Sequence, residues 1–175
     1  MRYLFCADTS WGSGLCNAGA ASFNEDISGW DTSEVTTMNN MFKEASSFNQ
    51  PIGGWVVDKV TDMQWMFKYA SSFDQDISNW SVSKVDDMSD MFKYATSFNQ
   101  PLGGWQVDQV TDMNDMFKDA SAFDQDLGWC VGDDVNLDLA FYNTPCASTL
   151  CGILWGGCDI PSNGNVMANW KIRIA

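Results

Sequence analysis

The sequence predicts an α/β solenoid: a right-handed stack of about five 25-residue coils, each made of a short helix and a strand. Two observations predict this fold class. The same residue types recur every 25 residues along most of the chain. Within one unit, the apolar spacing changes from a helical to an extended pattern. We expect a parallel sheet along one side of the stack and disulfide-stapled ends.

The 25-residue period places like residues in columns. We interpret the apolar columns as core packing, rather than as metal ligands or a carbohydrate cleft, because stacked coils bury equivalent side chains against one another. The columns are Met38, Met63, Met88, Met113; Met41, Met66, Met91, Met116; Phe42, Phe67, Phe92, Phe117; Phe23, Phe48, Phe73, Phe98, Phe123; and Trp30, Trp55, Trp80, Trp105, with Trp129 one residue early.

The two halves of a unit predict different elements. In VTDMQWMFKYA, the apolar residues from Val60 to Ala70 have the spacing of a short helix or a tight 3₁₀-like coil. In the other half we place a strand around Ile52–Val57, after Pro51, because proline cannot donate to a strand ladder. A polar column should satisfy backbone groups in the turns. Its members are Asn24, Asn49, Asp74, Asn99 and Asp124.

The repeats divide the chain into four parts. Residues 1–22 form a partial repeat, in which MRYLF matches the M-x-x-M-F of later units, with an insertion closed by Cys6 and Cys16. Residues 23–129 form the repeat solenoid, and residues 130–160 form a cysteine-rich C-terminal cap. Residues 161–175 form a tail whose alternation at Trp170, Ile172 and Ile174 indicates an edge strand. Because the chain opens inside a repeat, we expect it to be a piece of a longer protein.

The cysteines lie outside the regular repeats, and their number is even. They are Cys6, Cys16, Cys130, Cys146, Cys151 and Cys158. Disulfides at both ends would place the protein outside the cell or on its surface. The pairing of the last four cysteines stays open, and an all-cysteine zinc site there is the alternative interpretation.

Composition excludes several classes of function. A net charge of −14 without a basic cluster argues against a nucleic-acid partner. No apolar run reaches the roughly 20 residues of a membrane span. The absence of histidine excludes histidine-dependent triads, and no glycine-rich phosphate loop occurs. We therefore expect no enzymatic activity and no cofactor. Asp86, Asp87, Asp90 and the FDQD segment at 73–76 could gather calcium ligands, but EF-hand spacing is missing and we predict no metal.

Positions that vary between repeats are the candidates for binding. Trp65 interrupts a run of polar residues and lies four residues before Tyr69, while Tyr94 occupies the Tyr69 position of the next unit. Lys68 and Lys93 belong to a lysine column alongside. These five residues could form an aromatic surface, rimmed by lysine, for a protein or glycan. The alternative is that the rings only pack against the shoulder of the stack. Separately, Asn79-Trp80-Ser81 is an N-glycosylation triplet, whose use a buried Trp80 would hinder.

The repeat unit resembles that of the BspA-like leucine-rich repeat surface proteins, found in mycoplasmas, other bacteria, microalgae and giant viruses. The resemblance rests on the pattern W-x-V-S-x-V-x-x-M-x-x-M-F-x-x-A-x-x-F-N-Q-x-I and covers Ala20–Phe141. It implies a leucine-rich-repeat-like fold and a secreted or surface protein that acts in adhesion or protein interaction, without catalytic residues. The function we expect is non-enzymatic binding of protein or polysaccharide at the cell surface. The alternative is a self-assembling structural subunit of a filament, appendage or coat, in which other copies are the partners.

Overall fold

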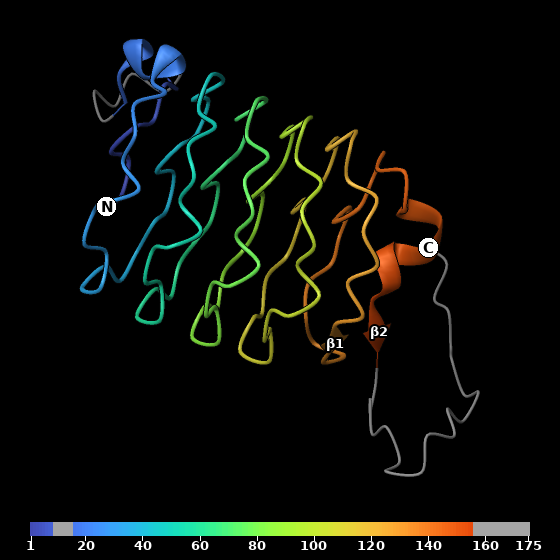
Figure 1. Cartoon of the computed structure of the whole chain (residues 1–175). Coiled ribbons are helices and arrows are strands. Elements are labelled where there is room, and N and C mark those ends of the chain that lie inside the picture. Colours follow the sequence, from blue (N-terminus) through green and yellow to red (C-terminus); the bar gives the residue numbers. More distant parts are fainter. Residues whose placement is uncertain (9–15, 156–175) are drawn as a thin grey trace.

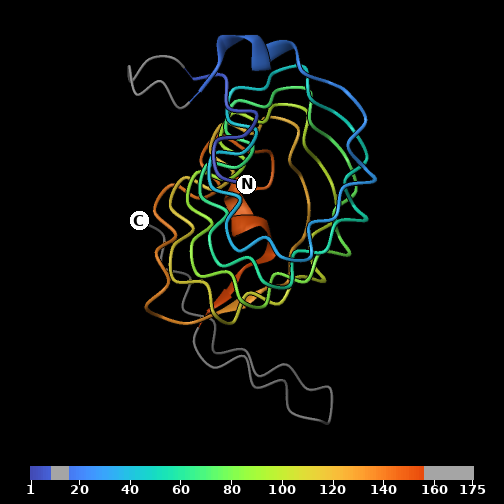
Figure 2. The same ribbon diagram turned by 90° about the vertical axis from the view of Figure 1, so that its left-hand side faces the viewer.

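Successive repeat units wind into coils that stack one on another, so the chain advances from one end of the molecule to the other (Figure 1). The computed structural model describes residues 1–8 and 16–155. Viewed along the stack, the coils overlay around a common interior (Figure 2). Residues separated by one 25-residue period therefore lie side by side. The predicted edge strand at Trp170, Ile172 and Ile174, and also Cys158, lie outside the described residues.

The predicted helix-plus-strand coil is wrong. Within the described residues, the only helices are two 3₁₀ helices, η1 at Ala18–Ser22 and η2 at Ala147–Gly152. In the same described ranges, the only sheet has two strands of two residues, β1 at Cys130–Val131 and β2 at Leu154–Trp155, paired in parallel. No strand forms at Ile52–Val57. Between neighbouring coils, the expected parallel sheet is reduced to isolated bridges such as Thr37 with Asp62 and Asp62 with Asp87.

Left-handed residues explain why the segment with helical spacing forms turns instead. Asn40 and Glu44 have φ angles of 58° and 61°, and a helix cannot continue through such residues. Backbone N–H groups then alternate in direction. Those of Asn40 and Phe42 donate to carbonyl oxygens of the next coil, at Gln64 (3.0 Å) and Met66 (2.9 Å). The N–H groups between them close turns within their own coil. Every second backbone N–H group thus forms a hydrogen bond to the next coil, as in a strand, although the apolar residues of this segment have helical spacing.

The apolar columns form the core, as their spacing predicts. The methionine and phenylalanine side chains from Met38 to Phe123 have no exposed surface. Like rings stack along the column: Phe42 and Phe67 have centroids 5.6 Å apart, and Phe67 and Phe92 5.5 Å apart. Each core tryptophan also has a polar role, since its indole N–H donates to a carbonyl of the preceding coil. Trp80 Nε1, for example, lies 3.1 Å from the carbonyl oxygen of Ile52.

The asparagine column stabilises the turns between coils in the expected way. Asn49 Oδ1 accepts the backbone N–H of Asp74 at 2.9 Å, and Asp74 Oδ1 accepts that of Asn99 at 2.9 Å. A glutamine in the next position adds a second donor: Gln100 Nε2 lies 2.8 Å from the same Asp74 oxygen. Backbone groups that no sheet satisfies therefore find partners along this column.

The two ends are built differently. At the start, residues 1–7 lie against the coil that begins at Met38, with the Phe5 N–H 2.8 Å from the Met41 carbonyl. The predicted disulfide between Cys6 and Cys16 is present. At the other end, Cys146 and Cys151 are paired, and Cys130 is also disulfide-bonded. These sulfurs are therefore not available as thiolate ligands, which removes the zinc alternative.

Candidate functional site

The candidate binding residues lie on one flank of the stack, in the turns that contain the left-handed positions. Trp65, Tyr69 and Tyr94 have φ angles of 60°, 61° and 59°. Bulky side chains seldom adopt this backbone conformation, which asparagine and aspartate tolerate better. Lys68 and Lys93 each directly precede one of the tyrosines. The structure thus brings all five candidates to neighbouring turns, but it gives them different surroundings.

The lysine column is part of an ion-pair ladder that runs between coils. Lys68 Nζ lies 2.7 Å from Asp90, and Lys93 Nζ lies 3.1 Å from the same carboxylate. Lys93 also pairs with Asp115, as does Lys118. These side chains are mostly buried. Their charges are therefore largely neutralised within the protein, and Lys68 and Lys93 are not a free basic rim for a ligand.

The ladder shifts the acidity of its members. Burial raises the pKa of the Asp90 carboxyl, but hydrogen bonding from Lys68, Lys93 and Trp65, together with the charge of Lys68, outweighs it and holds the pKa below its usual value. For Lys93, burial lowers the pKa, and its hydrogen bonds to Asp115 and Asp90 more than compensate, so this pKa is raised. Both groups are charged at neutral pH, and the ladder serves to hold the coils together.

The Trp65 ring takes the place of a carboxylate in this ladder. Its column contains Asn40, Asp90 and Asp115 in other coils. The ammonium groups of Lys43 and Lys68 lie 5.1 Å and 5.5 Å from the ring centroid, so two cation–π contacts replace ion pairs. The indole N–H is buried and makes no hydrogen bond of regular geometry, although it lies close enough to the Asp90 carboxyl to help lower its pKa. Trp65 is half-buried, and its surroundings are those of a packing residue more than of an open platform.

Tyr69 and Tyr94 form the accessible part of this flank. Their rings stack with centroids 4.6 Å apart and an interplanar angle of 5°. Tyr69 is 41% exposed and Tyr94 is half-buried. The negative charge of Asp119, together with burial and a hydrogen bond to that carboxyl, raises the pKa of Tyr94. A stacked pair of phenol rings with hydroxyl groups can contact an apolar sugar face or a protein side chain.

Two features of the ladder were not foreseen from the sequence. Asp8, close to the cysteine insertion, pairs with Lys43 across 35 positions. A further column consists of Glu44, Tyr69, Tyr94, Asp119 and Asn143, all with left-handed φ. Asparagine and aspartate at corresponding positions of several repeats were a signal for left-handed turns that the apolar spacing obscured.

The aspartates considered for calcium serve other roles. Asp62, Asp87 and Asp112 follow one another along the bridges between coils. Burial raises the pKa of Asp87, hydrogen bonds from Ser89 lower it, and the charges of Asp112 and Asp62 raise it further, with a net increase. Asp76 accepts the backbone N–H of Ser78. In the described part of the chain, no three acidic or cysteine side chains are placed to hold a metal ion together.

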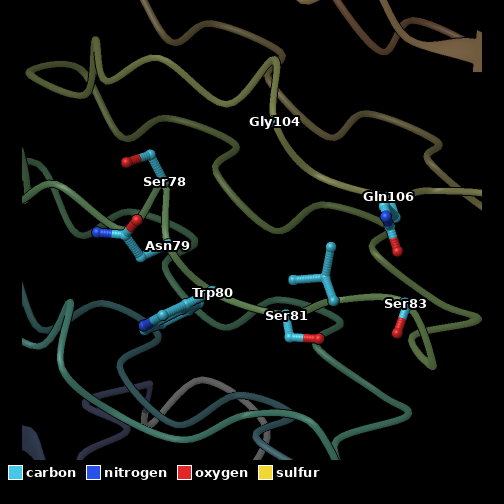
Figure 3. A pocket seen from close by; sticks show the side chains of 8 residues that line it. Ser78, Asn79, Trp80, Ser81, Ser83, Gly104 and Gln106 are labelled. Atoms are coloured by element: carbon cyan, nitrogen blue, oxygen red, sulfur yellow. The ribbon is translucent and has the colours of Figure 1, made fainter.

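A shallow polar hollow of about 230 Å³ lies on the surface near the glycosylation triplet (Figure 3). Its lining includes Asn79, Trp80, Ser81 and Gln106. Trp80 is buried, as its column predicts, whereas Asn79 and Ser81 are exposed. The acceptor amide of Asn79 therefore lies at the surface even though its neighbour belongs to the core. No helix within residues 1–8 and 16–155 has the length and apolar character to span a bilayer.

Comparison with known proteins identifies one family. A family described as "Mycoplasma protein of unknown function, DUF285" matches the chain over residues 15–105 and again over residues 53–148. Together the two matches extend from residue 15 to residue 148, well over half of the 175 residues. No curated protein and no solved structure matches the chain.

Proposed function

The chain belongs to the DUF285 family, and we propose that it is a BspA-like surface protein without enzymatic activity that binds a protein or polysaccharide partner outside the cell. The proposed contact surface is the flank around Tyr69 and Tyr94. The stacked pair of these two rings is the observation that carries the proposal. The described disulfides favour an extracellular or cell-surface location, because such bonds persist in oxidising surroundings.

The backbone at the tyrosine pair argues that folding alone does not select these residues. A left-handed backbone at an ordinary L-residue destabilises the fold by about 1–2 kcal/mol, and at asparagine or aspartate by less. Stacking of two aromatic rings stabilises the fold by about 0.5–1.5 kcal/mol. Asp119 and Asn143 in the same column show that a short polar residue fits the turn. Two adjacent tyrosines therefore bring little net stability, and a contact with a partner is the simplest reason for them.

A double variant tests the proposal. Tyr69→Asn with Tyr94→Asn places at both sites the residue that position 143 already carries, so the melting temperature should change little. Binding to arrays of glycans and extracellular matrix proteins should fall at least about tenfold. Val56→Asn is the matched control, since Val56 is 47% exposed outside the tyrosine column. Wild-type binding that survives the double variant, or that the control also removes, would place the contact elsewhere.

The alternative function is a structural subunit of an extracellular filament, appendage or coat. It is supported by apolar side chains exposed at the start of the stack, Leu4 and Trp30. Light scattering and electron microscopy of the purified chain separate the two functions. Extended polymers would favour the structural role, and their absence at high concentration would remove it.

A further inference from the structure

The tyrosine pair is the middle of a row of four side chains in consecutive coils, and both ends of the row are carboxylates. We call it the flank row, and its members are Glu44, Tyr69, Tyr94 and Asp119, none of which is buried. The backbone N–H of each member donates to a carbonyl oxygen of the next coil, as Glu44 does to Lys68 at 2.7 Å. This shared register holds the four left-handed residues in line, one coil apart. The stacked rings therefore have an acidic neighbour on each side.

The lysine column beside the flank row forms its ion pairs with other carboxylates. Its first member pairs with Asp8, and the later members pair with Asp90 and Asp115. Among the ion pairs of residues 1–8 and 16–155, none joins a lysine to Glu44 or to Asp119. The two ends of the flank row thus lie outside the ladder that neutralises the lysine charges.

The negative charge at both ends is only partly compensated within the protein. Burial raises the pKa of Glu44, the charge of Asp8 raises it further, and the charges of two lysines offset these effects incompletely. Asp119 accepts hydrogen bonds from two neutral groups, the Asn143 amide at 2.8 Å and the Tyr94 hydroxyl, and neither cancels its charge. The charge of Asp119 is the main reason why the pKa of Tyr94 is raised. A cation bound along the flank row would relieve the excess charge at both ends.

Aromatic rings on this flank already attract ammonium groups within the chain. Lys68 Nζ lies 6.0 Å from the centroid of the Tyr69 ring, and Lys118 Nζ lies 5.8 Å from that of Tyr142. Ring faces attract cations through their quadrupole, and carboxylates bind lysine and arginine through charge-assisted hydrogen bonds. The flank row places both kinds of group next to each other, with Tyr69 open to solvent.

We propose that the flank row binds a basic segment of a partner protein, with a lysine or arginine side chain on the Tyr69 ring and further cationic side chains at Glu44 and Asp119. This inference rests on the binding proposed above for the tyrosine pair and adds the chemistry of the partner. An anionic polysaccharide would meet like charges at both ends of the row. A neutral sugar could contact the rings, but it would leave the carboxylates without a partner.

The length of the row suits a short extended peptide. The two rings lie 4.6 Å apart, so three such steps from the first to the last member give about 14 Å, the length of four to five extended residues. Cationic side chains at both ends of such a segment would reach the two carboxylates while the residues between them cover the rings.

Fluorescence anisotropy with synthetic peptides tests the charge of the partner. The three probes are ten-residue peptides in which glycine alternates with arginine, with glutamate or with serine. The arginine peptide should bind the full chain at least about tenfold more tightly than the other two at low salt. Its affinity should fall as salt is added, because exposed charges are screened.

Substitutions of unchanged shape at the ends of the row separate this surface from the general acidity of the chain. Glu44→Gln with Asp119→Asn removes two charges and keeps an acceptor oxygen at each site. It should weaken binding of the arginine peptide about two- to thirtyfold, as expected for two exposed charge pairs. Asp58→Asn with Asp108→Asn is the matched control, since it removes the same charge from exposed positions outside the row. The control should change the affinity by less than about twofold.

Two results would overturn the inference of a basic partner. The first is an arginine peptide that fails to bind or that binds no more tightly than the serine peptide. The second is equal weakening by the end variant and its control, which would mean that net charge alone attracts the peptide. Circular dichroism checks that all variants fold.

Failure of this inference can be distinguished from failure of the proposed function. If Tyr69→Asn with Tyr94→Asn removes binding on the arrays while Glu44→Gln with Asp119→Asn leaves it unchanged, the flank binds an uncharged partner. The basic partner is then excluded, and the flank remains the contact surface. If neither double variant changes binding on the arrays, both the contact surface and its basic partner are refuted.

Discussion

Gly53 is the position where one added methyl group should disturb the contact between coils most directly. A Cβ atom on this residue would lie less than 3.0 Å from the carbonyl oxygen of Asp76 in the next coil, a distance that real Cβ atoms do not tolerate. The obstacle is backbone, so it cannot rotate away. The Asp76 carboxylate is held in turn by the backbone N–H of Ser78, which it accepts. The same coil is tied to the preceding one by the Trp80 indole N–H, which donates to the Ile52 carbonyl. Gly53→Ala must therefore push two coils apart.

Gly54 supplies the matched control one residue away. A Cβ atom there meets no other atom within 4 Å, and neither glycine needs a left-handed backbone. Overpacking in a tight interior costs about 1–3 kcal/mol. Where the backbone is compatible, replacement of glycine by alanine gains about 0.4–1 kcal/mol by restricting the unfolded chain. Gly53→Ala should thus be less stable than wild type, and Gly54→Ala equally or more stable.

Thermal unfolding with the disulfides intact measures the difference. Since 1 kcal/mol shifts the melting temperature of a chain of this size by about 2–4 °C, the two variants should melt several degrees apart. Gly103→Ala should fall between them, because its Cβ atom would lie 3.0 Å from the Leu127 carbonyl. Equal melting temperatures for Gly53→Ala and Gly54→Ala would refute the close approach of the coils at this point.

Two further substitutions test the columns. Asp87→Asn should raise stability at neutral pH by about 0.2–1 kcal/mol, the size of a like-charge pair across strands. Because the folded-state pKa of Asp87 is raised, this carboxyl contributes stability that is fully present below the ordinary carboxyl pKa and is lost as pH rises through the raised value. In denaturant titrations from pH 3 to 7, the stability of the variant relative to wild type should therefore increase with pH, and a constant difference would contradict the assignment. Trp80→Phe should cost about 0.5–1.5 kcal/mol in chemical denaturation, because the Ile52 carbonyl, which also accepts the backbone N–H of Trp55, loses one of its two donors. A loss no larger than that of Tyr69→Phe on the surface would contradict that role.

The sequence contained the columns but not the path of the backbone between them. The burial of the tryptophan column from Trp55 onward and the disulfide between Cys6 and Cys16 follow from period and position alone, and both are present, whereas Trp30 of the same column is exposed. The predicted helix in each unit is wrong because apolar spacing indicates which residues face inward, not how the chain turns between them. Trp65 and Tyr69 gave no hint of left-handed φ, since aromatic residues rarely adopt it. The energy that maintains this conformation comes from hydrogen bonds to the next coil, which local sequence does not reveal.

The same limit applied to the candidate site. Lys68 and Lys93 were predicted to rim a ligand surface because the lysine column stood out on an acidic chain. Their partners, Asp90 and Asp115, lie 22 positions further along the chain, one coil away. The pairs become visible only once the register between coils is known. Asp8 was missed for the same reason, because the cysteine insertion shifts it out of the 25-residue period.

Variation between repeats does not by itself mark a binding residue. The position of Trp65 varies between repeats, yet the residue there meets the lysine column whether it is a carboxylate at Asp90 or an indole at Trp65. Variation at this position replaces a carboxylate by an aromatic ring as the partner of a lysine ammonium group, and the contact between coils is kept. The tyrosine column differs in its exposure: the Tyr69 ring stacks on Tyr94, which hydrogen-bonds Asp119, and Tyr69 remains 41% exposed. Where a variable residue leaves much of its side chain open to solvent, contacts between coils account for only part of its identity, and the exposed ring of Tyr69 meets that condition.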